Sequence, residues 1–145
     1  MKLIWHSDGE EMLKMGNFQD YFFQNVTLFD EDEPILYAAI QGKFLVEFYD
    51  RLIELHEDDG ERSIYTYRNH SVLITRKGSL LTINSTRYGV TTYPFEEALS
   101  SLFEALKRYL IKIKRVNARV ALNDEYPQLS SRVRWYERLT VQAPL

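Results

Sequence analysis

The spacing of hydrophobic residues changes from a period of about 3.6 to a period of 2 at residue 63, and it returns to about 3.6 at residue 94. This change constrains the fold more than any other feature of the sequence. Between these positions polar and apolar residues alternate in short runs, which is the pattern of half-buried strands. Asn69-His70 and Lys77-Gly78 supply turn residues between the first three runs. The four expected strands are 63–68, 71–76, 79–84 and 88–93. The alternation predicts an antiparallel meander of four strands over about 63–93.

A helical period of about 3.6 residues flanks the meander on both sides. Before it, one polar position recurs every three or four residues, at Lys43, Glu47, Asp50, Glu54 and Glu57. After it, Pro94 opens a helix whose apolar stripe is Leu99, Leu102, Phe103, Leu106, Leu110 and Ile113. The spacing predicts helices over about 43–57 and 94–115. We therefore expect an α+β fold, an antiparallel sheet with both helices packed on one of its faces.

The remaining sequence predicts shorter elements and a single domain. The expected elements are a strand at 3–5, a strand near 21–29, a buried strand at 35–40 and a short helix near 130–139. The run Asp30–Pro34 separates two of these strands, and Asn123-Asp124 with Pro127 ends the long helix. The sequence contains no internal repeat and no linker rich in Pro, Gly or Ser. We expect residues 1–145 to form one globular domain.

The composition excludes several classes of protein. The absence of cysteine excludes disulfides, thiolate zinc sites, iron–sulfur clusters and cysteine nucleophiles. No apolar run approaches the roughly 20 residues of a transmembrane helix. The N-terminus becomes acidic at Asp8, too early for a secretory signal. We expect a cytoplasmic protein without a membrane partner.

Residues suited to catalysis or metal binding are scattered along the chain. The three histidines, His6, His56 and His70, have none of the paired spacings of metal sites, and no glycine-rich phosphate loop is present. The many carboxylates offer acid–base pairs, but every acidic protein does so. We expect no catalytic residue, no metal ligand and no cofactor. An enzyme with an unrecognised carboxylate and histidine site remains an alternative.

Charge is divided unevenly between the two parts of the sequence. Residues 1–62 hold fifteen acids and five bases, a net charge of −10, whereas residues 63–145 hold thirteen bases and six acids, a net charge of +7. This division indicates an acidic face, a basic face, or two halves that neutralise each other in the fold. The basic segment 107–119 is the feature that a nucleic-acid-associated or regulatory adaptor would use. The low pI of about 5.6 argues against nucleic acid as the partner.

The acidic residues of the first part are our predicted partner-binding site. Because Glu54, Glu57, Asp58 and Asp59 adjoin one another at a helix end, we expect them to form one patch, for a basic protein partner. The turn 30–33 joins this patch only if the strand order allows it. The predicted residues are Asp30, Glu31, Asp32, Glu33, Glu47, Asp50, Glu54, Glu57, Asp58, Asp59 and Glu61.

Three local features accompany this acidic, cysteine-free composition: the run Ile35–Gly42, the acidic helix after it, and Tyr93-Pro94-Phe95-Glu96-Glu97 opening the last long helix. In size, charge and order of elements the chain resembles the small α+β immunity proteins that bacteria encode beside secreted or contact-delivered toxins. The resemblance implies a non-catalytic protein that inhibits its cognate toxin, often a nuclease, by stoichiometric binding. It also implies occlusion of the toxin's basic groove by an acidic surface that bears tyrosines.

Overall fold

Two antiparallel sheets form the β part of the protein, whose computed structural model describes residues 1–142. The first sheet has the order β1-β2-β3, with bounds Leu3–His6, Val26–Asp30 and Glu33–Ala38. The second is the meander β4-β5-β6-β7, with bounds Gly60–Tyr67, His70–Lys77, Leu80–Ser85 and Gly89–Pro94. The predicted meander over 63–93 is confirmed, and it begins three residues earlier than predicted.

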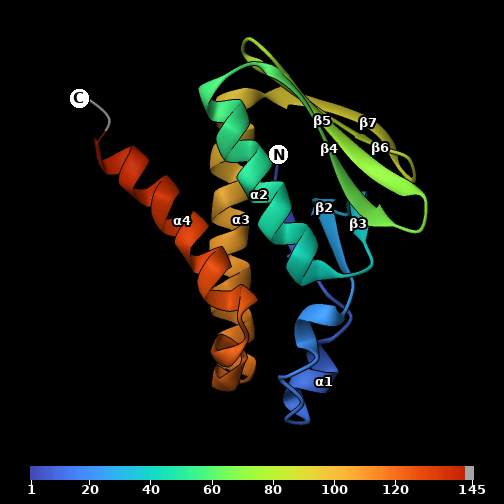
Figure 1. The fold of residues 1–145 in the computed structure, drawn as a ribbon, viewed down its shortest axis with the longest axis vertical. Helices are drawn as coiled ribbons and strands as arrows, with labels where there is room; N and C mark the ends of the chain where they lie inside the picture. Colours follow the sequence, from blue (N-terminus) through green and yellow to red (C-terminus); the bar gives the residue numbers. More distant parts are fainter. Residues whose placement is uncertain (143–145) are drawn as a thin grey trace.

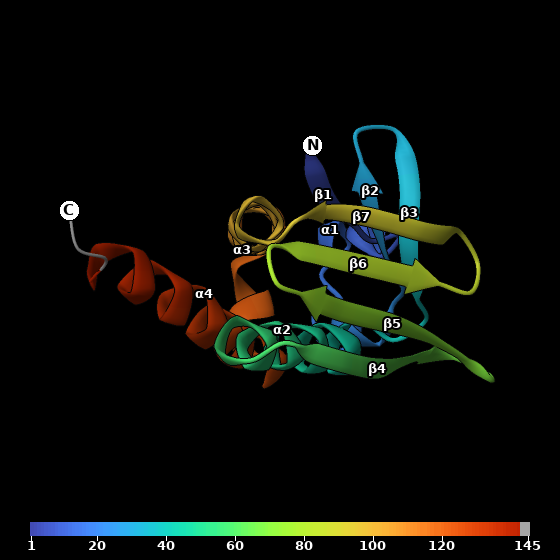
Figure 2. The ribbon, with the colours of Figure 1, turned by 90° about the horizontal axis from the view of Figure 1, so that it is seen from above.

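Helices pack beside the two sheets and account for the rest of the fold. The α-helices are α1 (Glu10–Lys14), α2 (Gln41–Glu57), α3 (Phe95–Val116) and α4 (Glu125–Gln142), and the 3-10 helices are η1 (Tyr21–Phe23) and η2 (Ala118–Leu122). Both predicted long helices are confirmed, and the fold is α+β. α4 runs across α2 and α3 on the side away from the sheets (Figures 1 and 2). Trp135 and Tyr136 in its second half still pack on Phe103, whereas Val141 near its end is 83% exposed. Within residues 1–142, no helix combines the length and the apolar character needed to cross a bilayer.

Three local predictions are corrected by the structure. The segment 21–29 is not one strand, because residues 21–23 form η1 and β2 begins at Val26. Phe23 N donates to the Asp20 carbonyl at 3.1 Å and Gln24 N donates to the Tyr21 carbonyl at 3.0 Å, and these bonds form the helical turn. Pro94 is the last residue of β7 rather than the first of α3. The final helix starts at Glu125, so Pro127 lies in its first turn, where a missing N–H breaks no intrahelical bond.

A single cluster of buried side chains connects both sheets with α2, α3 and α4. The meander contributes the inward-facing positions of its strands, and α3 contributes the predicted apolar stripe, in which Leu102, Phe103, Leu106 and Leu110 are all buried. In the centre, the Tyr49 hydroxyl accepts a hydrogen bond from Trp5 Nε1 at 2.8 Å and donates one to the Leu102 carbonyl. The two sheets are also joined directly, because Ala39 N donates to the Thr66 carbonyl at 3.1 Å.

Three buried polar side chains close a ring of hydrogen bonds between α2, α3 and η1. The Tyr21 and Tyr109 hydroxyls are 2.7 Å apart, and the Tyr109 hydroxyl donates to Gln41 Oε1. Gln41 Nε2 then donates to the Tyr21 carbonyl at 2.8 Å, which completes the ring. Burial raises the pKa of both tyrosines above the usual range. Both hydroxyls are therefore protonated at neutral pH and available as donors.

Candidate protein-binding surface

Arginines neutralise four of the predicted partner-binding carboxylates. The ion pairs are Glu47 with Arg51, Asp50 with Arg132, Glu54 with Arg51 and Arg62, and Asp59 with Arg76. The Arg132 guanidinium holds Asp50 with two hydrogen bonds of 3.0 and 3.2 Å, and the hydrogen bond from Arg62 lowers the pKa of the Glu54 carboxyl. Because Arg76 and Arg132 come from the basic part of the sequence, the two parts neutralise each other at these positions.

The turn between β2 and β3 carries four further predicted residues, Asp30 to Glu33, and lies apart from the others. Asp30 accepts hydrogen bonds from Lys2 N at 3.0 Å and from the Tyr93 hydroxyl at 2.8 Å. The Lys2 N–H lowers the pKa of the Asp30 carboxyl. Figure 2 shows this turn beyond β7, whereas the turn after α2 lies beside β4 at the opposite edge of the meander. The predicted acidic residues are therefore divided between two edges, and 30–33 does not join the patch at the end of α2.

Exposed acidic charge remains where α2 ends and β4 begins. Glu57, Asp58 and Glu61 are exposed and form no ion pair with any residue of 1–142. We call these three residues the acidic turn. Their neighbour Asp59 is exposed as well, but it accepts a hydrogen bond from Gly78 N at 2.7 Å, which ties the turn to the β5–β6 hairpin. The acidic turn is thus a fixed feature at the edge of the meander.

The outer face of the meander continues from the acidic turn. Glu61, Ser63 and Tyr65 occupy alternate positions of β4, so their side chains lie on the same face. Tyr65 is 60% exposed, and the half-buried Leu73 lies on the adjoining strand, in register with Ser63. Figure 2 looks onto this face, and the first sheet lies behind it. A rim of carboxylates therefore borders a sheet surface that carries an exposed aromatic and a partly exposed aliphatic side chain.

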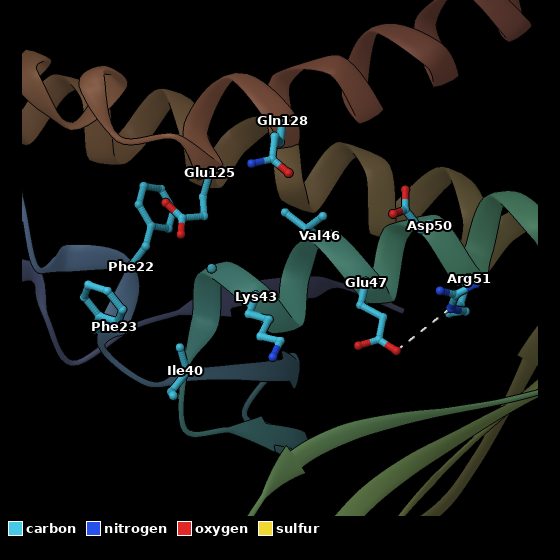
Figure 3. Close-up of a pocket in the computed structure, with 11 residues that line it drawn as sticks. Phe22, Phe23, Ile40, Lys43, Val46, Glu47, Asp50, Arg51, Glu125 and Gln128 are labelled. Atoms are coloured by element: carbon cyan, nitrogen blue, oxygen red, sulfur yellow. Dashed lines mark ion pairs between the residues drawn. The ribbon is translucent and has the colours of Figure 1, made fainter.

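A groove of about 520 Å³ lies on another side of the protein, between α2, η1 and the start of α4 (Figure 3). Phe22, Phe23 and Ile40 gather at one end of it, and Asp50 and Arg51 lie at the other. Phe23 is 65% exposed. The charged lining includes Lys43, Glu47, Asp50, Arg51 and Glu125. Because these charges have both signs, the groove does not select a partner by charge.

Close packing at Gly42 shapes this groove. A Cβ atom at Gly42 would lie 2.9 Å from Phe22 Cβ and 2.8 Å from Glu125 Cγ. Distances this short are not tolerated between carbon atoms, so the glycine allows η1 and the start of α4 to approach α2. Neither Phe23 nor Tyr65 is among the partner-binding residues predicted from the sequence. The exposure of Tyr65 could have been predicted, because in the alternating pattern of β4 it falls among the outward-facing polar positions.

The three histidines lie in separate surroundings. His6 Nε2 is 3.4 Å from an oxygen of Asp8, and His70 packs on Tyr67 with ring centroids 4.7 Å apart. His56 packs edge-on against Trp135, and its Nδ1 has no hydrogen-bond partner among residues 1–142. Over the same residues, no group of three or more His, Cys, Asp or Glu side chains is placed to hold a metal ion.

Comparisons with protein-family models, with curated proteins and with solved structures found no match to this chain. The function is therefore inferred from the surfaces alone. Of these, the acidic turn with the outer face of the meander has the clearest chemical character. It offers carboxylates without an ion pair within residues 1–142 at the edge of a sheet face that carries Tyr65 and Leu73 among Ser and Thr side chains, which suits a protein partner with basic side chains.

Proposed function

We propose that this chain is a non-catalytic protein-binding module that acts as an immunity protein. It neutralises a basic partner, its cognate toxin, by stoichiometric binding through the acidic turn and the outer face of the meander. The observation that supports this most is the position of Tyr65, which is exposed on the same face of β4 as Glu61, four residues further along the strand, while Glu61 lacks an ion pair within residues 1–142.

Each part of this surface has a physical role in the proposed interaction. Tyrosine buries a large area at little cost in conformational entropy, and it is enriched among the residues that dominate binding energy. Carboxylates at the rim accelerate the encounter with a positively charged protein, and this effect weakens as salt is added. The inward side chains of the same strands, such as Ile64 and Val72, are fully buried. They hold the surface rigid, so little order has to be gained on binding.

The proposed mechanism of neutralisation is occlusion. A toxin that cleaves nucleic acid needs a basic groove to bind phosphates. An acidic surface that occupies this groove excludes the substrate without any chemistry of its own. In this interpretation the exposed Glu57, Asp58 and Glu61 take the places of phosphate groups, and Tyr65 packs at the centre of the contact.

The test uses the protein encoded by the neighbouring reading frame as the candidate toxin. We expect it to be basic, to inhibit growth when expressed alone, and to be neutralised in a one-to-one complex with this chain. The triple variant Glu57→Lys, Asp58→Lys and Glu61→Lys should weaken the complex at least tenfold, on the order of 1.4 kcal/mol. Its association rate should also lose most of its dependence on salt.

The matched control reverses Glu31, Asp32 and Glu33 to Lys in the opposite turn. It changes the net charge by the same amount, so a purely nonspecific effect would weaken the complex equally. We expect less than a threefold change, on the order of 0.6 kcal/mol. If the control variant loses as much affinity as the acidic-turn variant, or if the neighbouring protein neither binds nor is neutralised, the proposed function is wrong.

A further inference from the structure

The C-terminal half of α3 carries a row of basic side chains. Arg108, Lys112 and Arg115 follow one another at intervals of four and three residues, so they share one face of the helix over about 10 Å. We call these three residues the basic stripe. Lys2, at the start of the first sheet, lines a hollow of about 310 Å³ together with Arg108 and Lys112. A second hollow, of about 520 Å³, is lined by all three residues of the stripe.

The charge of the basic stripe is largely uncompensated. All three side chains are exposed. Within residues 1–142 the stripe makes one ion pair, between Lys112 Nζ and Glu10 at 3.7 Å. Lys107, by contrast, lies outside the stripe and is held by Glu137 at 2.9 Å. The stripe is therefore a positive surface on a protein whose net charge is −3.

Apolar side chains accompany the stripe and indicate the kind of ligand. Ile111 lines the second hollow and is 42% exposed, and Ile4 lines the first and is 41% exposed. The aromatic residues of the first hollow, Trp5 and Tyr109, are only 2% and 5% exposed. They cannot stack on nucleic-acid bases, which is how single strands are commonly held. Exposed aliphatic groups beside a row of cations favour an amphipathic partner with negative charge.

We propose that the basic stripe docks an acidic amphipathic helix of a partner protein. A helix with carboxylates at positions i, i+4 and i+7 repeats the spacing of Arg108, Lys112 and Arg115. Its aliphatic residues pack on Ile4 and Ile111 as two helices do at an interaxial distance of about 8–10 Å. The stripe lies on the lower half of α3 in Figure 1, whereas the acidic turn lies at the upper end of α2. This second docking surface is therefore separate from the proposed toxin-binding surface and does not depend on it.

The experiment measures the binding of three fluorescent probes to the full chain. The first is a helical peptide of about 18 residues with Glu at i, i+4, i+7 and i+11 and Leu between them. The second is a scrambled peptide of the same composition, and the third is oligothymidine of about 20 nucleotides. We expect the helical peptide to bind at least tenfold more tightly than the scrambled one, with an affinity that falls as salt rises from about 50 to about 200 mM.

Charge-reversal variants locate the binding site. Reversing Arg108, Lys112 and Arg115 to Glu should lower the affinity for the helical peptide at least tenfold. Reversing Lys77, Lys114 and Arg138 to Glu makes the same change in net charge elsewhere and should alter it less than threefold. Should the triple reversal unfold the protein, Arg115→Glu and Lys114→Glu are compared instead, because these neighbours differ in whether they line the hollow.

Four results would overturn the proposal. Equal binding of the helical and scrambled peptides would mean that only charge is recognised. Binding of oligothymidine without binding of the peptide would make the stripe a nucleic-acid surface. Equal losses in the two triple variants would place the contact elsewhere. Concentration-dependent self-association that blocks the peptide would make a second copy of the chain the occupant.

Discussion

The two faces of the β4–β7 meander consist of alternate residues of the same four strands, yet they differ in burial and in the side chains they present. The inner face presents Ile64, Val72, Ile74, Leu81 and Ile83, all fully buried against the rest of the core. The outer face presents Tyr65, Leu73, Thr82, Thr92 and Val90, none of which is fully buried. Neighbours in sequence, such as Leu73 and Ile74, therefore experience opposite surroundings.

If the proposed function is right, the inner face of the meander determines stability and the outer face determines partner recognition. Substitutions on the inner face disturb close packing and are expected to lower the free energy of unfolding. Substitutions on the outer face leave the core intact, so their effects should be confined to binding. A surface of this kind can change its partner without loss of the fold. The following predictions test that separation, beginning with the largest effect.

Truncating Ile74 to Ala should lower the free energy of unfolding by about 2–5 kcal/mol, because it leaves a cavity in the inner face. Truncating the adjacent Leu73 to Ala should cost about 1 kcal/mol or less, since its side chain is only partly buried. Urea unfolding monitored by tryptophan fluorescence measures both. Equal losses in the two variants would show that the outer face is buried by something other than residues 1–142.

Replacing Asp30 by Asn should make the stability less sensitive to acid. The Lys2 N–H lowers the pKa of Asp30 in the folded state, so its carboxylate stabilises the fold above the unfolded pKa, about 3.9. This contribution is lost as the pH falls through the folded pKa. Between pH 7 and pH 2 the free energy of unfolding should therefore fall less in the variant than in the parent. We expect the difference to be below about 1 kcal/mol, because the carboxyl is partly exposed.

The control for this pH series is Glu57→Gln, in the acidic turn. Glu57 makes no ion pair or side-chain hydrogen bond within residues 1–142, so this variant removes one carboxylate without removing such a contact. Thermal midpoints across the pH range are sufficient for the comparison. If the thermal midpoints of Asp30→Asn and of the parent fall by the same amount as the pH is lowered, the contacts of Asp30 with Lys2 and Tyr93 contribute nothing to stability.

Replacing Tyr65 by Thr should have the smallest effect on stability, below about 0.5 kcal/mol, because both residues favour strands and the side chain is exposed. The urea midpoint is expected to stay unchanged, while the complex with the proposed toxin partner should weaken at least tenfold. If the variant is stable and binds as tightly as the parent, Tyr65 is not part of the interface. Only the carboxylates of the acidic turn would then support the proposed binding surface.

The periodicity of the sequence was sufficient to predict the long elements. The alternation over 63–93 and the polar stripe of 43–57 both describe one-sided burial, and burial of one face determines which period a segment shows. Residues 21–23 were misassigned for a physical reason. Aromatic residues favour strands in general, whereas the helical turn is defined by backbone hydrogen bonds within residues 20–24, which composition does not reveal.

The candidate binding surface was harder to predict, because charge compensation depends on contacts between distant residues. Asp50 and Arg132 are 82 positions apart, and nothing in either local sequence indicates that they pair. The separation of the turns 30–33 and 57–61 follows from the arrangement of the two sheets, which periodicity does not specify. The alternation in β4 placed Tyr65 outside the core, but it did not show that the face around it is open.

The ring formed by Tyr21, Gln41 and Tyr109 has a consequence for the uniqueness of the native state. Amphipathic helices such as α2 and α3 can slide past each other by one turn and still bury most of their apolar area. Any such slide would separate Gln41 from Tyr109 and leave buried polar groups without partners, which costs about 1–3 kcal/mol for each group. The ring thus fixes the register between α2 and α3. It raises the free energy of misaligned packings and so widens the energy gap between the native state and those alternative compact states.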